Sequence, residues 1–352
     1  MNSYVSTTVY MFEAILISLA LIAILAWLSI RYTAQFGLID RPNSAPHKQH
    51  PIPTPLAGGI ALLGTLLVAG WLMGTLRYPA VLATFGGALV VFLFGLWDDY
   101  RIVTPPLKLT GQVLGAIVMI LLGLGIRIFE SPEFFLTSNT PLDRYIDWGL
   151  TILWVVGITN AFNFVDSMDG LAVGLGGMAA AFFMLVALDS GQADLSRQFA
   201  LLLGACIGLY YFNASPARLF LGDSGAQTLG FILAGLAIAY HPRGANQSSS
   251  WFIPILLLAV PIFDAALVIF SRIRRGKAVY AAARDHTFHR LLRFGWESNR
   301  AVLAMQITAL FLSCLAFIVL TRPPLVANGV FVLVLICGAG ILLYLDSRKR
   351  WN

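Results

Sequence analysis

Long runs of apolar residues alternate with short polar segments along almost the whole chain. Most runs hold about 20 residues, the length that an α-helix needs to cross the hydrocarbon core of a bilayer. The pattern therefore predicts an all-α, polytopic membrane protein with about eleven transmembrane helices. The expected spans cover residues 12–32, 56–76, 79–97, 107–125, 147–165, 170–189, 198–213, 224–240, 251–271, 300–320 and 326–345.

The composition agrees with this pattern, because 58% of the 352 residues are apolar and only 11% are charged. An average soluble domain carries about a quarter charged residues. No polar segment here is long enough to build a hydrophobic core of its own. We therefore expect a single transmembrane domain over residues 1–352.

The 23 Lys and Arg residues are distributed unevenly between the predicted loops. Basic loops tend to remain in the cytoplasm. The bias therefore places the N-terminus outside and the C-terminus in the cytoplasm, as an odd number of spans requires. The loops expected on the cytoplasmic side are about 33–55, 98–106, 165–170, 214–224 and 272–299.

Five polar motifs fall on this predicted cytoplasmic face. Acidic residues beside a bilayer are costly and tend to mark function. Their convergence on one face predicts a single site there. The motifs are DRPNSAPHKQHPIPTP (40–55), the pair Asp98 and Asp99, NAFNFVDSMDG (160–170), NASPARLFLGDSG (213–225) and RIRRGKAVYAAARDHTFHRL (272–291).

The third motif places a polar residue at every third position: Asn160, Asn163, Asp166 and Asp169. This spacing follows a helical ridge that winds part-way round the helix. Such a ridge could present polar groups to an elongated ligand, for example a nucleotide diphosphate. Asp166 could instead cap the helix that follows.

The acids that end predicted helices indicate a cation. A helix C-terminus is the negative end of the helix dipole, so a carboxylate there needs a positive partner. Oxygen ligands without cysteine favour Mg²⁺, with Mn²⁺ as an alternative, over Zn²⁺. Basic residues available for further anionic charge are Lys108, Arg218, Arg284 and Arg290. The implied chemistry is transfer of a phosphoryl-linked group, with no nucleic-acid partner.

These motifs, in this order, resemble those of the polyprenyl-phosphate N-acetylhexosamine-1-phosphate transferases over roughly residues 35–295. The resemblance rests on NAFNFVDSMDGLA, LWDDY with Lys108 downstream, FNASPARLFLGDSG, and PIFD followed by RIRRG and RDHTFHRL. It implies transfer of an N-acetylhexosamine 1-phosphate, by default GlcNAc-1-phosphate, from a UDP-sugar to undecaprenyl phosphate. It also implies a bacterial inner-membrane protein whose site faces the cytoplasm. A homodimer is possible.

Within this family, the loop around His286 and His289 favours the branch that transfers GlcNAc-1-phosphate. The other branch uses UDP-MurNAc-pentapeptide and has a run of three histidines, which this chain lacks. Two positions depart from the expected motifs. Phe288 replaces an additional histidine, and Leu56 stands where an arginine is expected.

The resemblance also implies a role for each polar residue. Asp98 and Asp99 would lie beside the lipid phosphate, where one of them would deprotonate it, and Lys108 would hold that phosphate. Asn163 and Asp223 would bind Mg²⁺, and Phe220 would stack on the uracil. The remaining UDP-sugar contacts would be Asn160, Asp166, Asp169, Asn213, His286, His289 and Arg290.

Alternatives remain open at this point. The lipid phosphate could displace UMP directly, or an aspartate could form a covalent intermediate. A secondary transporter of sugar nucleotides would also carry intramembrane acids, but its site would lie near the bilayer midplane. Single residues have structural explanations too: Asp98–Asp99 as a helix stop, Phe220 as an interface anchor, and Asp264 as a partner of a neighbouring helix.

Overall fold

A computed structural model describes residues 2–40, 53–101, 103–131, 140–241, 250–278 and 285–347, with only the backbone at 2–7 and 34. The described chain is predominantly helical, as predicted. Its elements are α1 (Asn2–Tyr32), η1 (Thr33–Phe36), β1 (Ile39–Asp40), β2 (Thr54–Pro55), α2 (Gly58–Leu72), η2 (Thr75–Arg77), α3 (Pro79–Tyr100), α4 (Pro105–Leu121), α5 (Pro141–Val165), α6 (Leu171–Asp189), α7 (Ala193–Asn213), α8 (Gly222–Ile238), α9 (Ile253–Leu257), α10 (Ala259–Arg274), α11 (Thr287–Arg293), α12 (Ser298–Val319) and α13 (Pro324–Ser347).

Each predicted span coincides with one helix or with a pair of helices. Among the described residues, seven helices are long and apolar enough to cross a membrane: α1, α3, α5, α6, α7, α12 and α13. Helices α2 and α4 are apolar but shorter. The polytopic character is thus supported, whereas the number of eleven crossings and the orientation stay predictions. Most of the first motif (41–52), Arg284 and residues 348–352 lie outside the described residues.

The ninth predicted span differs from the structure, because it is divided into α9 and α10 at Leu258. Pro261 lies in the first turn of α10. Proline has no backbone N–H, so it cannot donate to the carbonyl four residues earlier. The hydrogen-bond ladder of α9 therefore cannot continue directly into α10.

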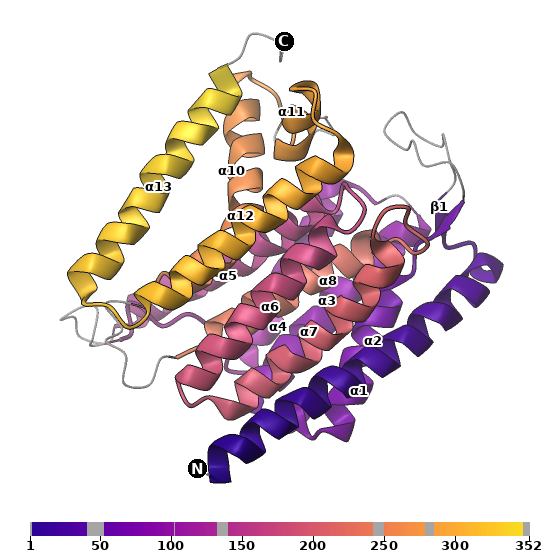
Figure 1. Cartoon of the computed structure of the whole chain (residues 1–352), viewed down its shortest axis with the longest axis horizontal. Helices are drawn as coiled ribbons and strands as arrows, with labels where there is room; N and C mark the ends of the chain where they lie inside the picture. The colour runs from indigo at the N-terminus through magenta and orange to yellow at the C-terminus, as the bar shows by residue number, and fades with distance from the viewer. Residues whose placement is uncertain are drawn as a thin grey trace.

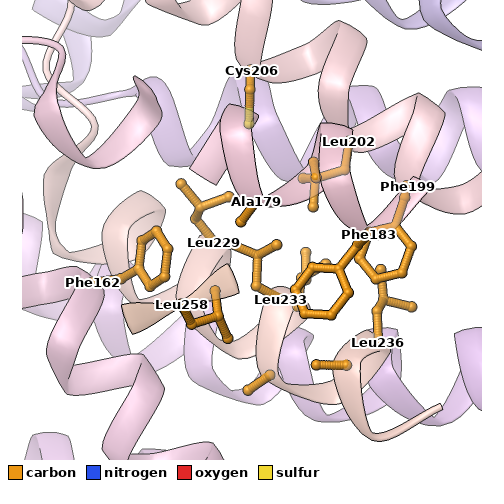
Figure 2. Packing of buried hydrophobic residues seen from close by; sticks show 14 of the residues in the cluster. Phe162, Ala179, Phe183, Phe199, Leu202, Cys206, Leu229, Leu233, Leu236 and Leu258 are labelled. Carbon is orange, nitrogen blue, oxygen red and sulfur yellow. The ribbon is translucent and has the colours of Figure 1, made fainter. Parts of the chain in front are cut away.

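Helix α8 lies inside the bundle and is buried along most of its length. It packs against α2, α3, α5 and α6, and Figure 1 shows it enclosed by these helices. Figure 2 shows Leu229 of α8 on the side of Phe162, and Leu233 of α8 beside the stacked rings of Phe183 and Phe199. This core fixes α8 firmly, and its N-terminus carries Asp223.

Close backbone contacts bring the start of α2 against the start of α8. A Cβ atom on Gly59 would lie only 2.5 Å from the backbone nitrogen of Gly225. Small residues allow helices in membranes to approach in this way. The backbone nitrogens of Gly58 and Gly59 donate to the carbonyl oxygens of Phe220 and Leu221 at 2.9 and 3.0 Å.

The helix ends that carry the motifs meet at one end of the bundle. Helices α3, α5 and α7 end there, and α4, α6 and α8 begin there, as the contacts between their terminal residues show below. The short antiparallel sheet of β1 and β2 lies at the same end. In Figure 1, α1 begins at the lower end of the view and α13 ends at the upper end, so these two helix termini lie at opposite ends of the bundle.

Candidate active site

An ion triad joins three helices at this end of the bundle. Lys108, near the start of α4, places its Nζ 2.6 Å from Oδ2 of Asp98 on α3. The same Nζ lies 3.0 Å from Oδ1 of Asp223 on α8. Side chains separated by up to 125 positions in sequence therefore meet, and one ammonium group is shared by two carboxylates. The structure thus brings together three of the predicted site residues.

The carboxylate of Asp99 binds the backbone of α8. Its Oδ1 accepts a hydrogen bond from the backbone N of Asp223 at 2.7 Å, and its Oδ2 accepts from N and Oγ of Ser224 at 3.0 and 2.5 Å. The N-terminus of a helix has unpaired N–H groups and the positive end of the dipole, so it attracts a carboxylate. Asp99 therefore holds in place the helix turn that carries Asp223.

The predicted helical ridge ends after its second member, because α5 ends one residue before Asp166. Asn163 lies on α5 and donates from Nδ2 to Oδ1 of Asp223 at 2.7 Å. Asp169 lies in the following turn, where its Oδ2 accepts a hydrogen bond from the backbone N of Ala217 at 3.1 Å. The expectation of one continuous helical ridge was wrong for Asp166 and Asp169, because the backbone turns away there.

Asp166 is half-buried among other acids. Burial raises its pKa well above the ordinary value, and the charges of Asp223, Asp99 and Asp169 raise it further. It does not cap the next helix, since α6 has Gly170 at its N-cap, with φ 73° and no side-chain hydrogen bond. The environment of Asp166 is therefore one that a nearby cation would stabilise.

Asn160 forms hydrogen bonds with an amide side chain and a backbone carbonyl rather than with the carboxylates of the site. Its Nδ2 donates to Oε1 of Gln112 at 2.6 Å and to the backbone oxygen of Val156 at 2.8 Å. Gln112 donates from Nε2 to Oδ1 of Asn160 at 3.3 Å and to Oε1 of Gln227 at 2.9 Å. Gln227 then donates to Oδ1 of Asp223 at 3.2 Å. This geometry gives no support to the predicted contact between Asn160 and the nucleotide.

Asn213 connects two loops of the site. Its Oδ1 accepts a hydrogen bond from the backbone N of Gly170 at 3.1 Å, and its Nδ2 donates to the backbone oxygen of Leu219 at 3.0 Å. The side chain is almost fully buried. Asn213 therefore positions the loops that carry Asp169 and Phe220, and a direct contact with a nucleoside stays a prediction.

Phe220 is held by its backbone at the edge of the site. Its N donates to the carbonyl of Pro55 at 2.9 Å, and it forms a parallel bridge with Leu56. The ring is only partly buried. Phe220 is thus placed by the end of the first loop, with part of its surface exposed, as a stacking residue would need.

His286 lies at the N-cap of α11 and is held by an acid inside the bundle. Its Nδ1 lies 2.9 Å from Oδ2 of Asp264 on α10, and the backbone N of Thr287 donates to Oδ1 of the same carboxylate at 2.6 Å. The ring also packs edge-on against Phe164, at 5.6 Å between centroids. Because Phe164 follows Asn163 on α5, the last motif reaches the same region as the ion triad. His289 lies beside it, with ring centroids 5.7 Å apart.

Arg290 occupies a buried ionic cluster instead of an open site. Only 1% of its side chain is exposed. Its guanidinium donates to the backbone oxygens of Leu345 and Asp285 and to Oγ of Ser271, and it lies 3.5 Å from Oδ1 of Asp346. The predicted contact between Arg290 and the sugar nucleotide gains no support from this placement. The residue joins α11 to α10 and α13.

The donor set of the ion triad suits a hard divalent cation. Asp98, Asp223 and Asn163 offer carboxylate and amide oxygens, the ligands that Mg²⁺ prefers. The ammonium of Lys108 already shows that this place stabilises positive charge. Within the described residues, no three His, Cys, Asp or Glu side chains could hold a metal by themselves. A metal here would therefore also use Asn163, water or the phosphates of a ligand.

Comparisons with known proteins match the region that builds this site. The model of "Glycosyl transferase family 4" matches residues 81–241. A Bacillus subtilis (strain 168) protein named "Probable undecaprenyl-phosphate N-acetylglucosaminyl 1-phosphate transferase" is 30% identical over 308 residues, 87% of this chain and 84% of that protein. The chain belongs to glycosyl transferase family 4. 

Two other relatives of this family 4 protein represent both predicted branches. The "Undecaprenyl-phosphate alpha-N-acetylglucosaminyl 1-phosphate transferase" of Escherichia coli (strain K12) is 26% identical over 79% of this chain and 75% of its own. The "Phospho-N-acetylmuramoyl-pentapeptide-transferase" of Limosilactobacillus fermentum (strain NBRC 3956 / LMG 18251) is 29% identical over 69% of this chain and 76% of its own. The family resemblance seen in the motifs is thereby confirmed.

The two residues that depart from the expected family 4 motifs, Leu56 and Phe288, both make defined contacts in the structure. Leu56 donates its backbone N to the carbonyl of Leu38 at 3.0 Å and forms the bridge to Phe220, so its contribution is made by the backbone. Phe288 is buried, and its ring stacks obliquely on His289 at 3.9 Å between centroids. Phe288 therefore helps to orient the histidine that follows it.

Two buried glutamines beside the ion triad of this family 4 protein were not predicted from its sequence. Gln112 and Gln227 are both 1% exposed and connect Asn160 to Asp223. Each glutamine lies four positions after a predicted site residue, Lys108 and Asp223 respectively, and so shares its helix face. A buried amide at that spacing was the available signal.

Proposed function

We propose that this chain transfers N-acetylhexosamine 1-phosphate, with GlcNAc-1-phosphate as the expected group, from the UDP-sugar to undecaprenyl phosphate and releases UMP. The product would be the first lipid-linked intermediate of a cell-envelope glycan. The observation that carries this proposal is the ammonium of Lys108 between Asp98 and Asp223. A cation among acids at a helix-bundle end suits two phosphate-bearing substrates, one of them embedded in the membrane. The names of the B. subtilis and E. coli relatives support the same sugar and lipid.

The reaction we propose is a direct displacement. A phosphate oxygen of the lipid attacks the sugar-bearing phosphorus of the UDP-sugar and forms a new P–O bond. The bond to the UMP phosphate breaks, and UMP leaves with its electron pair. The protein contributes mainly by positioning and by electrostatic stabilisation. A covalent intermediate on an aspartate is the competing mechanism.

Asp98 is better placed than Asp99 to receive a proton from the lipid phosphate. Asp99 is held by three donors at the start of α8, whereas Oδ2 of Asp98 lies against Lys108. Lys108 would hold the lipid phosphate and orient its attacking oxygen next to Asp98. Proton transfer by a carboxylate within hydrogen-bond reach would complete this role.

We also propose Mg²⁺, with Mn²⁺ as a substitute, as the cofactor, held by Asp223 and Asn163. When bound, the ion would neutralise charge that develops on the pyrophosphate. Asp166 and Asp169 would line the pocket for the UDP-sugar, Phe220 would stack on its uracil, and His286 and His289 would reach its pyrophosphate or sugar. This arrangement follows from the family motifs and from the proximity of their loops.

The site would face the cytoplasm of a bacterial inner membrane. This proposal rests on the excess of Lys and Arg in the loops at the same end of the bundle. Reporter fusions at the loop after α4 and at the loop after α10 test it. We expect the first to report the outer side and the second the cytoplasm, and the opposite pattern would reverse the orientation.

The function is tested by release of UMP from purified protein. We expect UMP only when UDP-GlcNAc, undecaprenyl phosphate and Mg²⁺ are all present, together with a lipid-linked pyrophosphoryl sugar. Undecaprenol without phosphate is the matched control, because it removes only the nucleophile. Uptake of intact UDP-GlcNAc into proteoliposomes without release of UMP would contradict the enzyme proposal and indicate a transporter.

The substrate is tested by a panel of UDP-sugars. The L. fermentum relative makes UDP-MurNAc-pentapeptide the second candidate donor. We expect UDP-GlcNAc, or a related UDP-N-acetylhexosamine, to have the higher kcat/KM. A preference for UDP-MurNAc-pentapeptide would place the chain in the other branch of the family.

A further inference from the structure

A chain of three amides, two of them fully buried, leads from the backbone of α5 to Asp223. It begins at the carbonyl oxygen of Val156 and continues through Asn160, Gln112 and Gln227. The three side chains come from α5, α4 and α8, so the chain crosses three helices. It ends on Oδ1 of Asp223, which also accepts hydrogen bonds from Lys108 and Asn163.

The direction of each amide in this chain is determined by its first member. A carbonyl oxygen can only accept a hydrogen bond, so Val156 must face the Nδ2 of Asn160 at 2.8 Å. That nitrogen also donates to Oε1 of Gln112, which turns Nε2 of Gln112 toward Oε1 of Gln227. Nε2 of Gln227 is then the atom that faces Asp223.

We propose that Asn160, Gln112 and Gln227 form an amide relay that positions the carboxylate of Asp223 for a divalent cation. This inference rests on the proposed function. Three nitrogen donors converge on Oδ1 of Asp223, so its Oδ2 is the atom that the relay presents to the ion. None of the three relay residues touches the substrates in this proposal. They are positioning residues.

The buried position of the relay supports a specific role. Gln112 and Gln227 are 1% exposed, and a buried amide without partners costs free energy. Apolar residues in the same places between α4, α5 and α8 would not carry this possible cost in free energy. The relay is satisfied only if every amide keeps one orientation, and that orientation holds the carboxylate in one place. Removal of a group that hydrogen-bonds to a metal ligand typically lowers metal affinity about 10- to 100-fold.

The test is Mn²⁺ binding to the purified, substrate-free protein, followed by electron paramagnetic resonance. The variants are Gln227→Leu, which removes the last donor, and Gln112→Leu, which removes the middle link and leaves every hydrogen bond to Asp223 in place. Gln198→Leu is the matched control. Gln198 is also a fully buried glutamine, but it lies on α7 and accepts a hydrogen bond from Thr75 at 2.7 Å, outside the relay.

We expect Gln227→Leu and Gln112→Leu to weaken Mn²⁺ binding about 10-fold or more, while Gln198→Leu leaves it unchanged. The double variant should bind Mn²⁺ no more weakly than Gln227→Leu alone, because both changes act through the same oxygen. If either relay variant does not fold, Asn160→Ala replaces it in the same measurement. Its thermal midpoint is compared with that of Gln198→Leu.

Wild-type affinity for Mn²⁺ in both relay variants would overturn the relay, as would an equal loss in the Gln198→Leu control. Absence of Mn²⁺ binding in the wild type would overturn it as well, because the relay presupposes a cation site at Asp223. The proposed function is tested separately by release of UMP. A protein that binds Mn²⁺ as expected but transfers no sugar phosphate would therefore refute the function and keep the relay.

Discussion

Asp98 and Asp99 are adjacent in sequence, but their carboxylates bind different partners. Asp98 forms an ion pair with Lys108 at 2.6 Å and accepts a hydrogen bond from the backbone N of Val103 at 2.6 Å. Asp99 binds the first backbone N–H groups of α8. Asp98 therefore belongs to the ion triad, whereas Asp99 supports the helix that carries Asp223.

This division predicts different consequences for the two isosteric amide variants. We expect Asp98→Asn to lower kcat by about 100- to 10,000-fold, because it removes the proposed base. Since Lys108 keeps Asp223 as a partner, the thermal midpoint should fall less than in Asp99→Asn. Asp99→Asn should lower the thermal midpoint more, because its amide nitrogen cannot accept the two hydrogen bonds that Oδ2 of Asp99 accepts from Ser224, each worth about 1 kcal/mol. The UMP assay and thermal unfolding in detergent measure the two effects. Equal loss of stability in both variants would contradict the division.

Gly222 offers a test of the contact between Asp99 and α8. Its φ is 74°, and a Cβ atom there would lie 2.7 Å from Oδ2 of Asp99. We expect Gly222→Ala to lower the thermal midpoint and to abolish transfer, because both strain and displacement of Asp99 follow from one methyl group. Gly191→Ala is the control: its φ is 72°, with no atom within 4 Å, so it carries the backbone strain alone, about 1–2 kcal/mol. Equal effects of the two variants would show that Asp99 plays no part.

The pair of Asp285 and Arg272 predicts a dependence of stability on pH. Burial by itself would raise the pKa of Asp285, but the hydrogen bonds and charge of Arg272 outweigh it and hold the pKa below its ordinary value. Two bonds, at 3.0 and 2.9 Å, join the side chains. A lowered pKa in the folded state means that the stabilisation is complete above the unfolded value of about 3.9 and is lost as the pH falls through the folded value.

We therefore expect Arg272→Gln to lower the thermal midpoint at pH 7 and to flatten its fall below about pH 4. Thermal unfolding of wild type and variant between pH 7 and pH 3 measures this. Arg300→Gln is a suitable control, because its ion pair with Glu297 lies at the surface, with side chains 74% and 72% exposed. An exposed ion pair contributes little to the free energy of unfolding. If the thermal midpoint of Arg272→Gln falls with pH as steeply as that of the wild type, the Asp285–Arg272 pair is not the cause of the fall.

Arg290 is expected to act on stability rather than on substrate binding. Its planar guanidinium bonds at once to Ser271 on α10, to Leu345 on α13 and to the backbone oxygen of Asp285 before α11, and lysine cannot reproduce that geometry. Arg290→Lys should therefore lower the thermal midpoint, while the KM for UDP-GlcNAc of the protein that stays folded remains the same. A raised KM without loss of stability would instead support the original prediction of a ligand contact.

The sequence determined the class of the protein and the positions of its helices, because apolar runs of membrane-spanning length can only be read as helices in a bilayer. It also determined which motifs lie at one end of the bundle, since consecutive helices alternate in direction. The division of the ninth span at Leu258 and the end of the ridge before Asp166 depended on local backbone geometry, which hydrophobic periodicity does not specify.

Only the tertiary structure decided which polar atoms meet. Asp98, Asp99, Asn160 and Arg290 were all predicted to face substrates, and these contacts stay predictions. The structure shows their protein partners: Lys108 for Asp98, and α8, Gln112 and the cluster at Asp346 for the others. The relay through Gln112 and Gln227 likewise joins the consecutive helices α4 and α5 to α8, which is remote from them in sequence. Motif spacing places a residue on a helix end, but the direction of a hydrogen bond between helices depends on their packing, which spacing does not contain.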